Sequence, residues 1–208
     1  MPLPPAGHGI YSLPITSNHF AWTVDDGGDS TVIRRYAELA RDTGTRLRFF
    51  PNGQYPGWAE SADLIAPMVA TGQIQIGNHT YSHLDLRTLS DQQIVDELMH
   101  NDEVLRNLFG ATVKPFYRPP FGYRNDRTDA AAASTGYSAP VMWYGSLADS
   151  GPISEDQVVA YAQQWFLPQH IVIGHANHPQ VTNVFPQLLA CIRDRGLQAV
   201  TLNDVFVP

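Results

Sequence analysis

The 208-residue chain contains a single cysteine, Cys191, and a single lysine, Lys114. One cysteine excludes an internal disulfide, and its place in an apolar helical pattern favours a small core residue over a nucleophile. The net charge is −7 and basic residues form no block, so nucleic-acid binding is not expected, because it requires a basic surface. No apolar run reaches the roughly 18–20 residues that cross a membrane.

The chain also lacks a long linker, a low-complexity tract and an internal repeat. With 43% hydrophobic residues it can bury one full core, so we expect an N-terminal arm at residues 1–9 and one domain at residues 10–208, as a monomer. The first residues, MPLPPAGHGI, have neither the basic nor the hydrophobic segment of a signal peptide. The expected location is the cytoplasm if the chain is complete, and the cell envelope or exterior if a signal peptide has been removed.

Seven short apolar runs are typical of parallel strands buried on both faces. They span residues 19–24, 45–50, 74–77, 114–118, 139–143, 170–174 and 197–202. Helical periodicity lies between them, at residues 30–43, 63–71, 90–109, 125–134, 154–166 and 179–195. This alternation predicts βα units around a parallel sheet, in a barrel of seven or eight units or, as the second choice, an open doubly wound sheet.

Polar residues follow most of the apolar runs. They are Asp25-Asp26-Gly27, Asn78 to His83, Arg118 with the loop to Gly122, Tyr144-Gly145-Ser146, and Gly174-His175. In a parallel barrel, all strands end on the same face, and active sites form there. The sequence therefore predicts an enzyme whose site residues are far apart in the chain but converge in space.

Two of these strand ends carry metal-ligand residue types. His79 and His83 are four residues apart, and Asp25 and Asp26 are adjacent, followed by two glycines that allow a turn. Two imidazoles and one carboxylate fill three corners of a tetrahedral site and leave the fourth for water, as in catalytic zinc sites. The set suits Zn²⁺, and also Co²⁺, Ni²⁺ or Fe²⁺. The second carboxylate is then free to act as a base.

Three further strand-end residues suit hydrolysis. Arg118 precedes a stiff Pro-Pro pair and could hold the free aspartate, because a guanidinium pairs directionally with a carboxylate. The backbone N–H of Phe121 is available as an oxyanion donor. His175 is the natural general acid, because its ordinary pKa lies near neutrality.

Aromatic side chains gather around the same loops, and such a rim would suit a sugar ring. The aromatic residues are Tyr55, Trp58, Tyr81, Phe121, Tyr123, Trp143 and Tyr144.

With these motifs assembled, residues 18–206 resemble the polysaccharide deacetylases of carbohydrate esterase family 4. TVDDG is similar to the family's TFDDG motif, while IGNHTYSH, YRPPFG and IVIGH resemble its second, third and last motifs. The resemblance implies a distorted (β/α)7 barrel, which is TIM-barrel-like. It also implies a metal-dependent deacetylase in which Asp25 is the base and Asp26, His79 and His83 are the ligands.

The same resemblance implies that Arg118 positions the base, that Phe121 helps to bind the oxyanion and that His175 is the acid. Ile173 stands where the last motif usually has Leu, and Asp149 matches the second Asp of a fourth motif, Asp-x-x-Asp-Trp. Ser150 replaces the Trp of that motif, so a wall of the acetyl pocket is missing or is supplied from elsewhere.

The expected function is de-N-acetylation of an amino-sugar glycan, such as chitooligosaccharide or peptidoglycan GlcNAc, with release of acetate. The altered fourth motif leaves alternatives open. One is a related amidohydrolase acting on a small non-sugar amide, or an O-acetyl esterase acting on xylan. The other is a sugar-binding domain without turnover, whose expected signature, the loss of Asp25 or His175, is absent.

Overall fold

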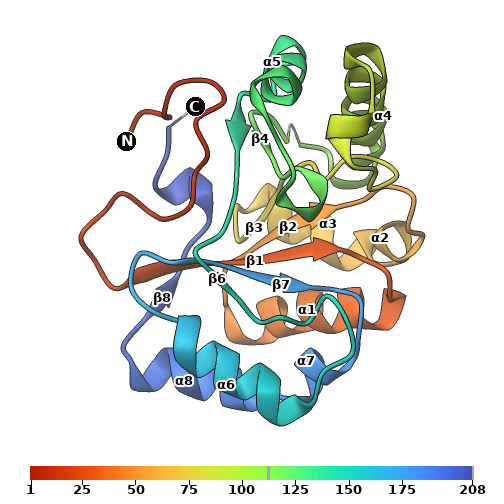
Figure 1. Cartoon of the computed structure of the whole chain (residues 1–208). Coiled ribbons are helices and arrows are strands. Elements are labelled where there is room, and N and C mark those ends of the chain that lie inside the picture. Colours follow the sequence, from red (N-terminus) through yellow and green to blue (C-terminus); the bar gives the residue numbers. More distant parts are fainter. Residues whose placement is uncertain (112, 208) are drawn as a thin grey trace.

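The structure, a computed structural model, describes residues 1–111 and 113–207. Its central strand is β1 (His19–Asp26), which pairs in parallel with β2 (Leu47–Pro51) and with β7 (Ile171–His175). Three short strands extend this sheet, namely β3 (Ile74–Ile76) beside β2, β6 (Gly145–Ser146) beside β7, and β8 (Gln198–Ala199) beside the start of β1. Figure 1 shows β1 and β7 crossing the middle of the molecule.

A second parallel sheet contains only β4 (Phe116–Tyr117) and β5 (Ala139–Pro140). A bridge between Asn78 and Tyr117 joins the end of β3 to β4. On the far side of β5, Ile10 bridges to Val141, and Ser12 bridges to His170 at the start of β7.

These bridges carry the strand pairing around the barrel and back to β7. The molecule is therefore a barrel with short strands along one part of its wall, as the sequence predicted in preference to an open sheet. The N-terminal segment takes part in closing it. In addition, Met1 is hydrogen-bonded to Val205 and Val207, so the two ends of the described chain lie together (Figure 1).

Helices connect the strands and cover the barrel. They are α1 (Ser30–Thr43), α2 (Gly57–Glu60), α3 (Ala62–Ala70), α4 (Asp91–Phe109), α5 (Asp126–Ser134), α6 (Glu155–Trp165), α7 (Gln180–Asn183) and α8 (Phe185–Asp194), with 3₁₀ turns at Leu86–Thr88, Pro120–Gly122 and Leu202–Asp204. In Figure 1, α1, α6 and α8 lie below the central strands, and α4 and α5 lie above them. Among the described residues, no helix is long and apolar enough to cross a membrane.

The helix ends follow from local sequence. The Ser90 hydroxyl accepts a hydrogen bond from the Gln93 backbone N–H while the Gln93 side chain accepts one from the Ser90 N–H, so α4 begins with a capping box. Gly110 ends α4 in a left-handed conformation. The cap of α1 is Asp29, whose carboxylate accepts from the N–H groups of Thr31 and Val32.

Two predictions of local structure were wrong. The helix expected at 179–195 is divided at Val184, because Pro186 has no N–H to continue the hydrogen-bond pattern from α7. No strand was expected at residues 144–146, which were placed after the apolar run 139–143, but Gly145–Ser146 forms β6 against β7. A two-residue strand has no periodicity that sequence inspection can detect.

Residues of β1 alternate between two apolar clusters. Phe20, Trp22 and Val24 pack with the helices in the outer core. Ala21 belongs to an inner cluster inside the barrel, together with Phe50. Since neighbouring strand residues point to opposite faces, Asp25 shares the inward face of Ala21 and enters the barrel at its carboxyl end.

Candidate active site

The two adjacent aspartates reach the same site because the backbone turns at Asp26, the last residue of β1. Asp25 is 1% exposed, and its side chain points into the barrel with that of Thr23. Asp26 has a left-handed backbone at φ 66°, and Gly27 follows at φ 109°. The Asp26 carbonyl oxygen accepts hydrogen bonds from the Trp58 indole N–H at 2.9 Å and from a backbone N–H of the next strand end. This turn brings both carboxylates to one side.

Gly27 is required at this turn for two reasons. Its positive φ is a conformation that L side chains rarely adopt. A Cβ there would lie 2.2 Å from Nε1 of Trp58, the same nitrogen that holds the Asp26 carbonyl.

The second ligand segment, residues 79–83, follows β3 as an irregular loop. Thr80 and His83 both have left-handed backbones, at φ 67° and 57°. The i,i+4 spacing of the histidines therefore works through a tight loop and not through a helix. The two imidazole rings still meet, with centroids 4.9 Å apart.

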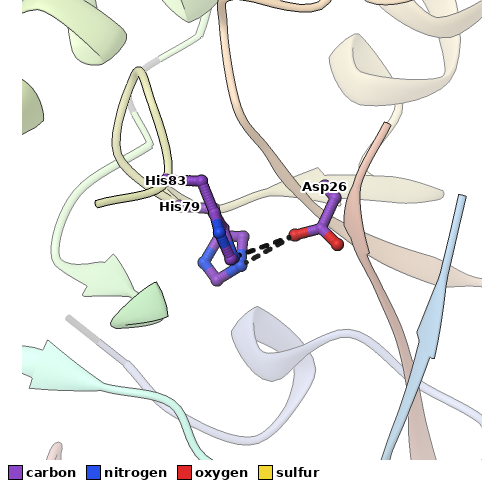
Figure 2. A group of neighbouring side chains, drawn as sticks. All are labelled: Asp26, His79 and His83. Carbon is purple, nitrogen blue, oxygen red and sulfur yellow. Dashed lines mark ion pairs between the residues drawn. The ribbon is translucent and has the colours of Figure 1, made fainter. Parts of the chain in front are cut away.

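Asp26, His79 and His83 form a compact donor cluster, with ligand atoms all within 4.8 Å of one another (Figure 2). Oδ1 of Asp26 lies 3.1 Å from Nε2 of His79 and 3.3 Å from Nε2 of His83. This oxygen is buried and has no hydrogen-bond partner among the described residues. An orphaned carboxylate oxygen between two imidazole nitrogens fits a divalent cation, which would accept lone pairs from all three.

Hydrogen bonds from neighbouring residues orient the side chains of His79 and Asp26. Nδ1 of His79 lies 2.7 Å from the Arg118 carbonyl oxygen, so this nitrogen donates its proton and leaves the lone pair on Nε2. The Asn177 amide donates to Oδ2 of Asp26 at 2.7 Å, and its own oxygen accepts from the Gly28 N–H at 2.9 Å.

The electrostatics of the cluster favour a cation. Burial opposes ionisation of Asp26, but the histidines His79, His175 and His83 outweigh it and hold its pKa well below the usual range. Burial lowers the pKa of His83 and favours its neutral imidazole, whereas at His79 the charges of Asp25 and Asp26 outweigh burial and raise the pKa. A carboxylate kept ionised beside a neutral imidazole suits metal binding.

Arg118 is fully buried, and all three nitrogen atoms of its guanidinium donate hydrogen bonds. Its Nη1 donates to Oδ1 of Asp25 at 2.6 Å and to the Thr23 hydroxyl at 2.9 Å. Nε and Nη2 donate to the carbonyl oxygens of Val141 and Met142. Asp25 is thereby fixed with its second oxygen 3.5 Å from Nε2 of His79, close to the donor cluster.

His175 ends β7 and forms a pair with Asp149. Asp149, which is 3% exposed, accepts from the His175 backbone N–H at 3.1 Å and contacts its Nδ1 at 3.0 Å. Burial lowers the pKa of His175, but the hydrogen bond and charge of Asp149, with Asp25 and Asp26, raise it above its usual value. The imidazole therefore tends to carry a proton.

A cavity of about 520 Å³ joins these groups. Its lining residues are Asp25, Asp26, His79, His83, Pro119, Phe121, Gly122, Tyr123, Trp143, Ser146, Ser150, Ile173 and His175. Phe121 is 56% exposed, has a left-handed backbone at φ 59°, and places its ring 4.5 Å from that of His83.

Most of the residues singled out in the sequence converge on this cavity. Trp143 and Ile173 line it, while Arg118 and Asp149 lie behind Asp25 and His175. Tyr144 is not in the lining, and its ring packs on His170 and Trp165.

Two contributors to the site were not selected from the sequence. Asn177 contacts Asp26 although it lies 151 residues away in the chain, and Thr23 shares the Arg118 guanidinium with Asp25. The position of Asn177 two residues after a candidate catalytic histidine was the only available signal, because asparagine has no characteristic spacing for this role.

A sequence model of the polysaccharide deacetylase family matches residues 14–140. The chain belongs to the polysaccharide deacetylase family. This agrees with the resemblance inferred from the four motifs.

Curated relatives of this polysaccharide deacetylase are distant in sequence. A peptidoglycan-N-acetylglucosamine deacetylase of Bacillus cereus is 24% identical over 200 residues, which cover 94% of this chain and 71% of the relative. A chitin deacetylase of a Pestalotiopsis species is 32% identical over 123 residues, covering 58% and 40%. A bifunctional xylanase/xylan deacetylase of Cellvibrio japonicus is 25% identical over 181 residues, covering 87% and 26%.

Solved structures confirm the distorted (β/α)7 barrel. The chitin deacetylase of Colletotrichum lindemuthianum superposes with a TM-score of 0.83 at 21% identity, over 97% of this chain and 92% of that one. A pseudoenzyme of carbohydrate esterase family 4 from Bacillus anthracis also gives a TM-score of 0.83, at 20% identity, over 98% and 69%. The fold alone is therefore compatible with the presence or absence of activity. Whether a member of this fold is active depends on the side chains in its cavity.

Proposed function

We propose that this polysaccharide deacetylase removes N-acetyl groups from an amino-sugar glycan, with a divalent metal at Asp26, His79 and His83. The observation that carries the proposal is the placement of Asp25. Arg118 holds this carboxylate beside the donor cluster, and His175 lines the same cavity. A binding domain without turnover would have no use for a fixed base and a histidine that tends to be protonated.

We further propose Zn²⁺ as the native ion, with Co²⁺ or Ni²⁺ as possible substitutes, because two imidazoles and one carboxylate match catalytic zinc sites. When bound there, the ion would polarise the acetyl carbonyl and lower the pKa of a water molecule. The side chains of the protein supply the remaining steps.

Asp25 accepts the proton of the attacking water, and Arg118 keeps its carboxylate oriented during the transfer. The backbone N–H of Phe121 donates to the oxyanion that forms at the acetyl oxygen. His175 then protonates the amine nitrogen as the C–N bond breaks. Its Nδ1 contact with Asp149 leaves Nε2 to carry that proton. The products are acetate and a free amino sugar.

The proposed substrate is a β-1,4-linked glycan containing GlcNAc. The similarity to chitin and peptidoglycan deacetylases supports this class. The exposed rings of Phe121 and Tyr123, which are 56% and 46% exposed at the cavity, offer apolar faces to a sugar ring. Such substrates favour action at the cell envelope or outside the cell, and we propose that the chain acts as a monomer.

Acetate release tests the proposal directly. Purified protein is incubated with chitooligosaccharides and with peptidoglycan, before and after a chelator removes metal, and again after Zn²⁺ is restored. We expect release that the chelator abolishes and zinc restores. Turnover that is unaffected by the chelator would contradict the metal assignment.

Acetylated xylan is the second candidate substrate, because one relative is a xylan deacetylase and Ser150 stands where the family motif has Trp. Small acetylated amines form a third arm of the same assay. Faster acetate release from xylan or from the small amines than from the amino-sugar substrates would reassign the substrate and leave the metal chemistry intact.

A further inference from the structure

The loop that carries the two histidine ligands is strained. Thr80 and His83 lie at φ 67° and 57°, a region that side chains with a Cβ rarely adopt and that is least favourable for a β-branched residue such as Thr. Such a residue is energetically unfavourable and persists only where the surroundings hold it. The metal ligands therefore depend on contacts that stabilise this loop.

Glu97, on α4, provides such contacts between the two strained residues. Its Oε2 accepts from the backbone N–H groups of Tyr81 and Ser82, at 3.1 and 2.8 Å, and its Oε1 accepts from the Ser82 hydroxyl at 2.5 Å. All three groups that contact Glu97 are hydrogen-bond donors, and both oxygens of an ionised carboxylate are acceptors, so each contact is a satisfied hydrogen bond. Glu97 is half-buried, which strengthens these bonds relative to a fully exposed pair.

Neighbouring residues of α4 hold the entry to the same loop. The side-chain NH₂ of Asn78 donates to the Leu98 carbonyl oxygen. Oδ1 of Asn78 accepts from the Asn101 side chain at 2.8 Å and from the Thr80 backbone N–H at 2.9 Å. The helix thus fixes the loop before His79 through Asn78. It fixes the segment between His79 and His83 through Glu97.

We infer that Glu97 is a positioning residue for the metal site. By holding residues 81 and 82, its carboxylate keeps the imidazoles of His79 and His83 directed at Asp26 before metal arrives. Without it, the freed N–H groups turn to water, and the loop relaxes from the strained conformation. Metal binding must then restore that conformation, and the affinity falls. This inference rests on the proposed metal site.

The test measures zinc affinity, independently of turnover. Metal-free full-length protein competes with a chromophoric chelator for Zn²⁺, as wild type, Glu97→Ala and Glu97→Gln. We expect the dissociation constant of Glu97→Ala to rise about tenfold or more, the usual effect of losing an outer contact of a metal ligand. Glu97→Gln should stay within about threefold of wild type, because its oxygen accepts both N–H groups and its amide can donate to Ser82.

Glu103 provides the matched control, since it lies on the same helix and is exposed. Glu103→Ala should bind zinc as wild type does. At saturating zinc, Glu97→Ala should regain most of the wild-type acetate release, since the chemical groups are intact. A purely structural role would lower the melting temperature and leave the zinc affinity unchanged.

Wild-type zinc affinity in Glu97→Ala would overturn the inference, as would an equal loss in Glu103→Ala. Should Glu97→Ala fail to fold by circular dichroism, Glu97→Asp takes its place, because the shorter side chain withdraws the carboxylate while keeping its charge. It should lose affinity to a similar degree. Absence of zinc binding in the wild type would instead refute the proposed function itself.

Discussion

Two walls of the cavity are built differently. The wall proposed to hold the metal and the base, here called the metal wall, consists of Asp25, Asp26, His79 and His83, and Asp25 and His79 are no more than 2% exposed. The wall proposed to face the acyl group of the substrate, here called the substrate wall, consists of Trp143, Ser146, Ser150 and Ile173. Ser150 is exposed, and the Ser146 hydroxyl accepts one hydrogen bond, from the Ala148 N–H.

The difference reflects what each wall must do. The proposed proton transfer and metal binding require atoms placed within about half an ångström, and hydrogen bonds with Arg118, Asn177 and Glu97 hold the metal wall in place. Recognition of a sugar tolerates movement and exposed apolar faces. We therefore expect changes in the metal wall to abolish turnover and changes in the substrate wall to alter selectivity.

The largest effect is expected for Asp26→Ala, which removes the only carboxylate of the proposed ligand set. Zinc binding and acetate release should disappear together, measured as metal content after desalting and as product formed. Asp25→Asn separates the two roles, since it should keep zinc and lose turnover. Loss of zinc in Asp25→Asn with retention in Asp26→Ala would mean that the two aspartates exchange roles.

His175→Ala should retain zinc and lose about two to four orders of magnitude in kcat, the usual contribution of a general acid. Steady-state kinetics on a chitooligosaccharide, with zinc content measured in parallel, provide the check. Near-normal turnover in this variant would show that another group protonates the amine.

A smaller effect is expected for Asp149→Asn. The charge of Asp149 raises the pKa of His175, and a general acid works only while it is protonated, so activity falls as pH rises through that pKa. Removing the charge lowers the pKa, so the alkaline limb of the kcat/KM profile should move to lower pH. An unmoved limb would mean that it reports a different group.

Ser150→Trp should have the smallest effect and should act on selectivity alone. A tryptophan added to the substrate wall leaves less room for the acyl group. The ratio of kcat/KM for an N-propionyl substrate to that for an N-acetyl substrate should fall about fourfold. This factor corresponds to the free energy of burying one methylene group. An equal change for both substrates would place Ser150 away from the acyl group.

The sequence predicted much of this structure, for identifiable reasons. Helices with strong periodicity and capping residues, such as those at 30–43 and 90–109, were predicted within a residue of the observed ends. Strands were detectable because parallel strands buried on both faces are continuously apolar. The division between α7 and α8 and the two-residue strand β6 fell below what periodicity can resolve.

The candidate site divides in the same way. Residue type and strand-end position were enough to select Asp25, Asp26, His79, His83 and His175. They were not enough to select Asn177 or Glu97, because each acts through a hydrogen bond to a residue distant in the chain. Any exposed Glu on α4 would have looked the same in the sequence.

The sequence by itself determined the barrel, the family and the residue types of the chemistry, because hydrophobic period and strand-end position are local properties of the chain. The tertiary structure alone decided how the turn at Asp26 brings both aspartates to one side, that the histidine loop is strained and not helical, and which residues hold it. The reason is physical. Backbone turns with positive φ and hydrogen bonds between distant segments arise only when the strands have closed into a barrel.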